Sequence, residues 1–586
     1  MEYITAGESH GPNLTAIVTG VPAGLPVSVD HINSDLARRQ AGYGRGGRMA
    51  IEKDTVRVTS GLRFGRTIGS PIALEVANRD WENWTERMAA FGEAPRDLVR
   101  EVTPRPWHAD LLGALRTNTD DCRNILERAS ARETAARVAA AGVAREFLAA
   151  LGVEVMSYVV SVGDAAMPEE TMADAAEHKP LDIELSEMRC PDAKATIAMK
   201  KAIDRAKSDG ESLGGTFRIV VCGLAPGLGT YATGADRLTS RLGAALFSIP
   251  AIKGVEFGLG FQAAARPGSQ VHDPIVLADG EFRRTSNNAG GLEGGMTTGM
   301  PLVITAAMKP IPTLMTPLET VNLDTLCVEE ASKERSDVCA VPAAAVVAEG
   351  EVAFALANAY LEAFGDTCMA DIKANIKAYK ARLRTMGQRR VDEGNVEDAV
   401  ALMNSIFDDR FACEQVRFAK DALIPLDELE RLEVEQLRRR LEALVRREVR
   451  LLPDFAPLGE EIPFGEGDDE FVYAGVHVAG KVDRIDVDAY GRAVVIDYKG
   501  SVGREYAFRR AEDDGTVLPR KMQTLIYAQM ARRKLGLIPV GAIYLSYGKD
   551  GAVRGLFDRT VLDGEGDLLG MDPKTCGTSD FAQALD

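Results

Sequence analysis

The chain has 586 residues, of which 46% are hydrophobic and 27% are charged, so it is too apolar for a disordered protein and long enough for two or more globular domains. Its formal net charge of -18 argues against a broad affinity for nucleic acid. The sequence shows neither a basic-then-apolar start nor an apolar run of about 20 residues, which predicts a cytoplasmic protein with no membrane segment.

The first candidate site is the pentapeptide Gly7-Glu8-Ser9-His10-Gly11 near the start of the chain. It places one of only six histidines between a hydroxyl, a carboxylate and two glycines, in a stretch too polar for a core. Histidine has the side-chain pKa nearest neutrality, and glycine lets a ligand approach the backbone closely. Taken alone, a turn with an incidental histidine explains the pentapeptide equally well.

Residues 1–390 predict one large α/β domain, followed by a linker at 391–425 and a second domain at 426–586. In the first domain, short strand patterns alternate with long helical patterns, the strands at 15–18, 55–58 and 217–222 and the helices at 123–151 and 343–364. The two helical patterns are so rich in alanine that we expect both helices inside the domain, packed closely against their neighbours.

Arginines are concentrated in short stretches of the first domain, although the protein is acidic. Arg38, Arg39, Arg45 and Arg48 fall within eleven positions. Guanidinium groups bind phosphate and carboxylate with two parallel hydrogen bonds, so this island predicts a small polyanionic ligand. Residues 42–47 formally satisfy GxGxxG, but they follow a helical pattern and precede a strand, which is the reverse of a dinucleotide-binding site. We interpret them as a basic loop that closes on an anion, or as a surface turn.

Four later segments carry further candidate groups. Residues 103–110 hold His108 in a proline-stiffened loop beside Arg105, and residues 127–134 place Arg128 and Arg132 on one helical face with Ser130 near a helix start. That second segment predicts a cradle for a phosphate or a cofactor. Residues 309–313 form a rigid loop, and residues 335–337 place Asp337 two positions after an arginine.

Together these segments identify a family resemblance: residues 1 to about 388 resemble chorismate synthase. The resemblance rests on seven motifs in order, which are GESHG (7–11), RRQAGYGRGGRM (38–49), RPWHAD (105–110), ERASARET (127–134), SNNAGG (286–291), KPIPT (309–313) and RSD (335–337). The resemblance implies an α/β fold with a β-α-β sandwich core, in which helices lie between two antiparallel sheets.

The resemblance also implies a reaction, the 1,4-anti elimination of phosphate from 5-enolpyruvylshikimate-3-phosphate to give chorismate. That reaction requires reduced FMN although it involves no net oxidation or reduction. By resemblance, His10 acts at the departing phosphate, His108 protonates or stabilises the reduced flavin, and Asp337 works with flavin N5 in removing the ring proton.

Further site residues follow from the same resemblance. The substrate would contact Ser9, Arg48, Arg105 and Arg132, and the flavin would contact Arg128, Ala129, Ser130, Ala251, Gly294, Lys309, Pro310, Ile311, Pro312, Thr313 and Arg335. Arg39 and Arg45 match positions assigned to NADPH in bifunctional relatives, and the family forms homotetramers. This chain departs from the family pattern at Trp107 for a usual glycine, Arg116 for lysine, Pro250 for asparagine and Glu351 for an apolar residue. We expect activity to survive Trp107, whose bulk beside His108 would narrow the flavin pocket.

The second domain opens with an amphipathic helix at 426–452, which we interpret as core-facing in preference to a partner-binding zipper. Farther on, Asp497 and Lys499 lie two apart in a predicted strand and therefore face the same side, while Asp483 can lie on the neighbouring strand. Two carboxylates and an ammonium group can bind Mg²⁺ and orient water for phosphodiester cleavage. A D-x-K pattern alone is more often a surface salt bridge.

The companions GKVDRID (480–486) and a QxxxY pattern beginning at Gln523 favour the metal site, with Asp483 and Asp497 as ligands. This stretch is similar to the PD-(D/E)XK nuclease domain of the RecB and AddB type, a smaller α/β restriction-endonuclease-like fold. The CxxC of iron–sulfur members is absent, and an acidic domain is a poor partner for DNA. Three interpretations remain: a synthase with an active nuclease tail, a synthase with a non-catalytic interaction module, or a DNA-processing protein with a vestigial synthase part.

Overall fold

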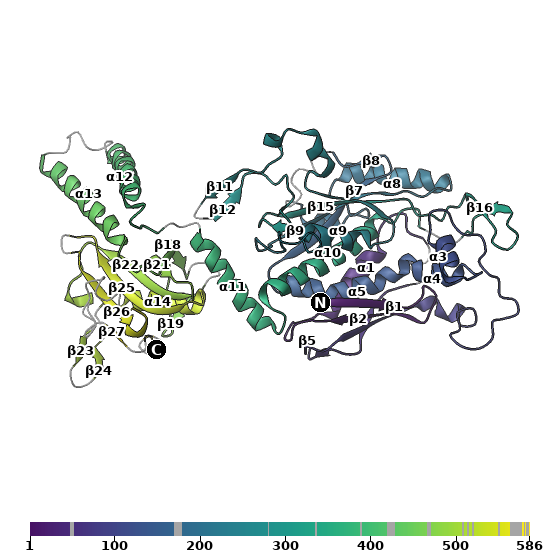
Figure 1. The fold of residues 1–586 in the computed structure, drawn as a ribbon, viewed down its shortest axis with the longest axis horizontal. Coiled ribbons are helices and arrows are strands. Elements are labelled where there is room, and N and C mark those ends of the chain that lie inside the picture. Colours follow the sequence, from purple (N-terminus) through teal and green to yellow (C-terminus); the bar gives the residue numbers. More distant parts are fainter. Residues whose placement is uncertain are drawn as a thin grey trace. The chain divides into compact units, whose positions relative to one another are not determined.

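The structure is a computed structural model, and it describes the chain in two compact units (Figure 1). Unit 1 comprises Met1–Val276 and Arg284–Ile376, and unit 2 comprises Leu277–Arg283 and Lys377–Asp586. The described residues exclude 47–51, 169–177, 279–280, 334–336, 387–389, 419–427, 466–469, 507–508, 512–514, 518–520, 549–550, 563–576, 579–580, 582–584 and 586.

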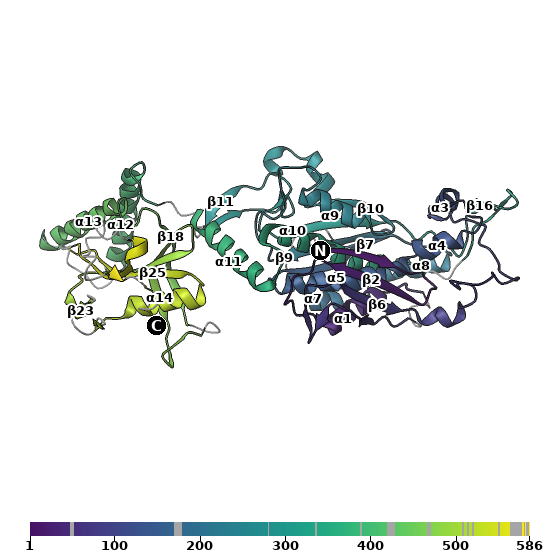
Figure 2. The same cartoon turned by 60° about the horizontal axis from the view of Figure 1, so that its bottom comes forward.

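Unit 1 is a sandwich of two antiparallel sheets with helices between them (Figures 1 and 2). The first sheet has the order β1-β2-β6-β3, from Glu2–Ala6, Asn13–Thr19, Ile72–Ala77 and Val56–Val58. The second has the order β10-β15-β9-β7-β8, from Ile252–Phe257, Leu302–Met308, Gly215–Cys222, Glu154–Val162 and Ala165–Ala166. Helix α5 (Thr134–Ala149) packs on β2 and β6, helix α10 (Val341–Phe364) packs on β7 and β9, and the two helices pack on each other. This arrangement confirms the predicted β-α-β core.

Small residues allow the middle-layer helices to approach closely. A Cβ atom at Gly142 of α5 would lie 2.7 Å from Ile32 of α1 (Val29–Gln40), and one at Gly350 of α10 would lie 2.7 Å from Ala141. Real Cβ contacts are never that short, so glycine is required at both crossings. The predicted burial of the alanine-rich helices is confirmed. Helix α10 is also the described helix long and apolar enough to cross a membrane, and 89% of its most apolar window is buried inside the protein.

The helical pattern predicted at 123–151 is interrupted in the structure. Helix α4 ends at Ala129, a short 3-10 turn covers Ala131–Glu133, and α5 begins at Thr134. Ser130 between them has extended backbone angles, and its hydroxyl accepts a hydrogen bond from the Arg132 amide. Serine competes for backbone donors in this way and favours helix starts. The interruption turns Arg128 and Ser130 toward the loop that holds His10.

Unit 2 is built on a six-stranded mixed sheet with the order β18-β21-β22-β25-β26-β27. Its strands are Ala456–Phe464, Gly480–Val487, Arg492–Lys499, Ile538–Ser546, Val553–Asp558 and Gly577–Thr578. Residues of helix α14 (Gln523–Lys534) pack in the apolar cluster on one face of this sheet, and Leu444 of helix α13 (Glu428–Glu448) packs against the cluster on the other face. Helix α13 thus contacts this core at Leu444, whereas Leu432 near its start is exposed.

Residues 396–418 differ from the linker with short helices that the sequence predicted at 391–425. They form one helix of 23 residues, α12 (Val396–Phe418), which packs against α13. The amide of Asn404 donates to Glu442 at 2.8 Å, and Arg446 forms an ion pair with Glu397. The boundary between the two units lies between residues 376 and 377, so α12 belongs to unit 2.

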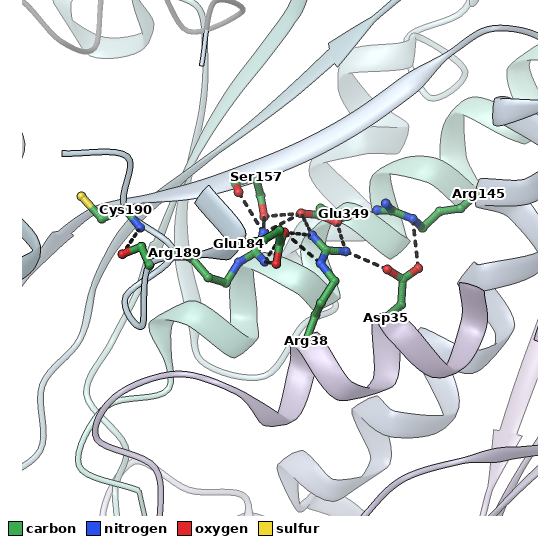
Figure 3. A network of polar contacts seen from close by, with 9 residues as sticks. Asp35, Arg38, Arg145, Ser157, Glu184, Arg189, Cys190 and Glu349 are labelled. Atoms are coloured by element: carbon green, nitrogen blue, oxygen red, sulfur yellow. Dashed lines mark hydrogen bonds and ion pairs between the residues drawn. The ribbon is translucent and has the colours of Figure 1, made fainter. Parts of the chain in front are cut away.

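A buried carboxylate ties together the helices and the second sheet of unit 1 (Figure 3). Glu349 of α10 is fully buried and accepts hydrogen bonds from Arg38 of α1 at 2.8 and 2.9 Å, and from Arg145 of α5 at 2.5 Å. Arg189 and the Ser157 hydroxyl of β7 also donate to Glu349, at 3.0 and 2.6 Å. Burial alone would raise the pKa of Glu349, but the three guanidinium groups outweigh burial and hold that pKa well below its usual range.

Replacing Glu349 by glutamine is predicted to lower the free energy of unfolding of unit 1 by about 1–3 kcal/mol, because it removes the carboxylate that Arg38, Arg145 and Arg189 share. The three guanidinium groups then keep only their pairs with Asp35 and Glu184. All three tryptophans lie in unit 1, so tryptophan emission during urea unfolding reports on that unit. The matched control is E362Q on the same helix, which breaks an exposed pair with Arg241 and should cost less than about 1 kcal/mol.

The same depressed pKa gives this prediction a pH signature. The contribution of Glu349 is complete above the unfolded pKa of about 4.3 and is lost as the pH falls toward the lower folded value. The difference between wild type and E349Q should therefore be largest at neutral pH and shrink in acid. A difference that stays constant from pH 7 to pH 3 would contradict this account.

Candidate active site

His10 is held by a buried carboxylate and an aromatic ring. Its Nδ1 lies 2.9 Å from Glu127 Oε1, and its backbone amide donates to Glu127 Oε2 at 2.8 Å. The imidazole stacks on Trp84 with 4.0 Å between ring centroids. Burial opposes ionisation of Glu127, but the hydrogen bonds and charge of His10 outweigh it and lower the pKa of Glu127. With Nδ1 engaged, Nε2 is the ring nitrogen left for chemistry.

The loop around His10 joins the segment that ends α4. The Ser130 hydroxyl donates to the Ser9 hydroxyl at 3.1 Å, and the Ser9 amide donates to the Glu127 carbonyl at 2.9 Å. Arg128 donates to the carbonyl oxygens of Thr5 and Gly7 and remains partly exposed. The predicted positions Ser9, His10, Arg128 and Ser130 therefore lie together.

Two of the arginines predicted for ligands are engaged inside the protein. Arg132 donates to both oxygens of Asp54, at 2.7 and 2.8 Å, and Arg39 donates to Thr134 at 2.9 Å and to the Ala131 carbonyl at 3.0 Å. Both side chains are buried, which makes them supports for the 130–134 segment. Arg38, in the same basic island, is engaged with Glu349.

His108 has the same kind of anchor as His10. Its Nδ1 lies 2.5 Å from Asp110 Oδ1, and Arg105 donates to Asp110 Oδ2 at 2.9 Å and to the Thr313 hydroxyl at 3.2 Å. Burial would raise the pKa of Asp110, but the hydrogen bonds from His108 and Arg105 prevail and lower it to about 2. Asp110 therefore stays ionised and fixes His108 with Nε2 outward.

The carboxylates that anchor the two histidines lie on helices that touch. His108 precedes helix α3 (Asp110–Thr117), and Glu127, the partner of His10, lies on α4 (Arg123–Ala129). A Cβ atom at Gly113 of α3 would lie 2.4 Å from the Ile125 side chain of α4, so the helices are in close contact. This packing places both imidazole anchors in one region of unit 1.

Asp337 lies beside the basic loop. Its carboxylate accepts a hydrogen bond from the Gly46 amide at 2.5 Å and lies 3.3 Å from Arg45. Burial lowers the pKa of Arg39, and the charges of Arg132 and Arg45 lower it further. The predicted positions Arg48 and Arg335 lie outside the described residues.

The remaining predicted flavin positions fall into two places. Lys309 donates its amide to the Ala251 carbonyl at 2.9 Å, and Ser212 donates to the Ile311 carbonyl at 2.7 Å, so Ala251 lies beside the 309–313 loop that contains Pro310, Pro312 and Thr313. Gly294 lies in the turn between β13 (Leu292–Glu293) and β14 (Met296–Thr297) at φ 58°, and a Cβ atom there would meet nothing within 4 Å. Ala129 ends α4 beside Ser130.

The predicted metal site of unit 2 lies on the face of the sheet that packs on α14. Strand β21 pairs with β22 in a register that sets Arg484 opposite Ile496, and one step further sets Asp483 opposite Asp497. Asp483 accepts a hydrogen bond from the Tyr498 amide at 2.8 Å, and Lys499 Nζ lies 2.6 Å from Asp497 Oδ2. Gln523 begins α14 and donates to the Tyr527 hydroxyl at 2.6 Å.

Asp497 carries a charge that the described residues do not fully satisfy. It is completely buried, and neither carboxylate oxygen has hydrogen-bonding geometry to a described residue; the contact with Lys499 is close in distance but lacks that geometry. Burial raises the pKa of Asp497, Lys499 opposes the rise, and Asp483 adds to it. Orphaned buried oxygens beside a second carboxylate suit Mg²⁺, which binds through one or two carboxylates and keeps several waters. No group of three or more acidic, His or Cys ligands occurs among the described residues.

Comparison with known proteins agrees with the geometry of unit 1. The family model for chorismate synthase matches residues 1–361. The chain belongs to the chorismate synthase family. Chorismate synthase of Syntrophotalea carbinolica is 54% identical over 65% of this chain and 97% of its own length, and that of Trichlorobacter lovleyi is 53% identical over 66% and 100%. A crystal structure of chorismate synthase matches with 41% identity and a TM-score of 0.54, covering 65% of this chain and 98% of its own. Like these relatives, unit 1 is a lyase.

The rest of the chain matches a second family. The model of the PD-(D/E)XK nuclease superfamily matches residues 376–556, which confirms the resemblance found in the second domain. The match begins at the boundary between the two units, so it includes α12 and α13 as well as the sheet.

Several residues that shape these sites were not predicted. Glu127 and Asp110 lie within the quoted motifs, and a carboxylate two residues after His108 was an available signal for its anchor. Asp54 and Trp84 lie far in sequence from their partners Arg132 and His10, and no local pattern marks them.

Replacing Asp497 by asparagine is predicted to raise the thermal stability of unit 2 in chelator and to abolish its stabilisation by MgCl₂. A carboxyl whose folded pKa is raised destabilises the fold at neutral pH, and a bound Mg²⁺ would offset that cost in the wild type. Calorimetry of the full chain with EDTA or MgCl₂ tests this, with E461Q at an exposed carboxylate as control. Equal stabilisation of wild type and D497N by Mg²⁺ would refute the metal assignment.

Proposed function

We propose that unit 1 catalyses the 1,4-anti elimination of phosphate from 5-enolpyruvylshikimate-3-phosphate, giving chorismate with reduced FMN as cofactor. The observation that carries the proposal is the pair of histidines, each anchored at Nδ1 by a buried carboxylate on helices that touch. Anchoring at Nδ1 fixes the tautomer and leaves Nε2 for proton transfer. A cytoplasmic homotetramer that also binds NADPH is a further part of this proposal.

The donors around this region suit reduced FMN. Arg128, Ser130, Lys309 and Thr313 supply guanidinium, hydroxyl and ammonium groups that can bind a phosphate and ring carbonyl oxygens. The turn at Gly294 is open, since a Cβ atom there would meet nothing. When bound, reduced flavin supplies electron density to the reacting ring of the substrate.

The residues of the chain divide the remaining work. Nε2 of His10 would hold a proton at the departing phosphate. Nε2 of His108 would hold a proton toward the flavin, and Arg105, fixed by Asp110 and Thr313, would orient a substrate carboxylate. Asp337 would help to remove the ring proton, with Arg45 3.3 Å from its carboxylate.

The variant D110N should release phosphate from the substrate about 10²–10⁴ times more slowly than wild type, because asparagine cannot hold His108 and Arg105 as an ionised carboxylate does. Phosphate release under anaerobic conditions with reduced FMN measures the rate. The control is D120N, which breaks an exposed pair with Arg100 and should be neutral. Wild type that releases no phosphate would favour a vestigial synthase part.

For unit 2 we propose a Mg²⁺-dependent DNA nuclease site formed by Asp483, Asp497, Lys499 and Gln523. Asp483 and Asp497 would hold the metal, whose chemistry is to polarise the phosphodiester and activate water. Lys499 would orient that water from the end of β22, and the orphaned oxygens of Asp497 support this assignment. The acidic character of the unit opposes DNA binding, so a bound metal or a partner would have to offset the repulsion.

Cleavage of single- and double-stranded DNA by the full chain should require Mg²⁺ and disappear in D497A and in K499A. Gel assays with and without EDTA measure the cleavage. The control is K481A, a change on the same strand as Asp483 that breaks the exposed pair of Lys481 with Glu461. Metal-independent cutting, or cutting that survives both variants, would contradict the proposal. No cutting at all would leave unit 2 as an interaction module.

A further inference from the structure

Trp107 combines a left-handed backbone with an exposed side chain. Its φ is 58°, a region that favours glycine, and the residue is 72% exposed. The neighbouring side chains of the same loop are turned inward and paired, as Arg105 and His108 are through Asp110. Strained residues of this kind cluster at functional sites, where the surroundings hold them in place. The indole therefore stands out beside His108 without the burial that normally fixes an aromatic ring.

Two ammonium groups hold the ring instead. Lys309 Nζ lies 5.0 Å and Lys253 Nζ 5.9 Å from the ring centroid, distances at which cations are attracted to indole. Ile252, next to Lys253 on β10, pairs with Met308, next to Lys309, so both lysines come from one edge of the second sheet. Burial and the charge of Lys253 lower the pKa of Lys309, which shows that the two cations repel each other.

No carboxylate neutralises this pair. Lys309 donates to the Pro310 carbonyl at 3.3 Å, and across the described residues neither lysine forms an ion pair with Asp or Glu. Two uncompensated cations beside an exposed aromatic face attract a ligand that is both planar and anionic. The cluster lies at the predicted flavin positions, because Lys309 begins the 309–313 loop and its amide donates to Ala251, two residues before Lys253.

We propose that Trp107 and Lys253 form an added part of the flavin site in this chain, in which the indole stacks on the isoalloxazine ring and Lys253 compensates the anionic charge of the cofactor. This inference rests on the proposed flavin dependence of unit 1. Trp107, which stands where the family usually has glycine, would then supply binding surface for the flavin. From the sequence we had expected its bulk to narrow the flavin pocket.

The test is a titration of the full chain with oxidised FMN, and anaerobically with reduced FMN, followed by ultrafiltration for Kd and by tryptophan emission for contact. W107G should raise the Kd about three- to tenfold, as expected for loss of an aromatic stack. K253Q should raise the Kd and weaken its dependence on salt. W107F should retain most of the affinity but lose most of the FMN-induced quenching.

Controls separate this inference from the proposed function. W81F removes another of the three tryptophans and should leave the Kd and the quenching by Trp107 intact, and K194Q removes an exposed lysine of helix α8 (Ala193–Ser208). Glycine adopts φ 58° without strain, so W107G is expected to fold. If wild type binds FMN and W107G binds it equally well, the inference is overturned and flavin dependence stands. If wild type binds no FMN, both the inference about Trp107 and the proposed flavin dependence of unit 1 are contradicted.

Discussion

The contact of Glu349 with three guanidinium groups determines how unit 1 is assembled. A single carboxylate on α10 receives hydrogen bonds from α1, α5 and β7, so it fixes the middle layer of helices to the second sheet (Figure 3). Arg39 follows Arg38 on α1, and α5 begins at the segment that holds Ser130 and Arg132. The position of these site residues therefore depends on a charge network buried behind them. Removing one member of such a network is costly because its partners stay buried and charged.

The arginines of unit 1 illustrate how far sequence alone could go. Seven ordered motifs identified the family and its sandwich from the sequence. Which guanidinium groups face a ligand could not be predicted, because that depends on Glu349 and Asp54, which lie far away in sequence. Long-range pairs of this kind form only when the chain has folded, and no local spacing reports them.

Secondary structure shows the same division between local and non-local signals. The predicted strand that holds Asp497 and Lys499 is present as β22, because local alternation is enough to indicate it. The sequence indicated a helix start near Ser130 but also one continuous helical pattern over 123–151, because alanine-rich helical propensity continues on both sides of the serine. In the structure a contact with Ser9 accompanies the extended conformation of Ser130. Helix α12 was missed because its sequence is acidic and weakly patterned, and it gains its stability by packing on α13.

Three buried carboxylates of unit 1 and Asp497 of unit 2 have opposite pKa shifts. In unit 1 the buried carboxylates Glu127, Asp110 and Glu349 are matched by cations that lower their pKa values, so the fold itself satisfies them. In unit 2 burial raises the pKa of Asp497 although Lys499 Nζ lies 2.6 Å from it, so the described residues compensate this carboxylate only in part. A site that keeps such a group sacrifices stability for function, which is the usual signature of a binding position. The described residues of unit 1 thus compensate these three buried carboxylates, whereas those of unit 2 leave Asp497 only partly compensated.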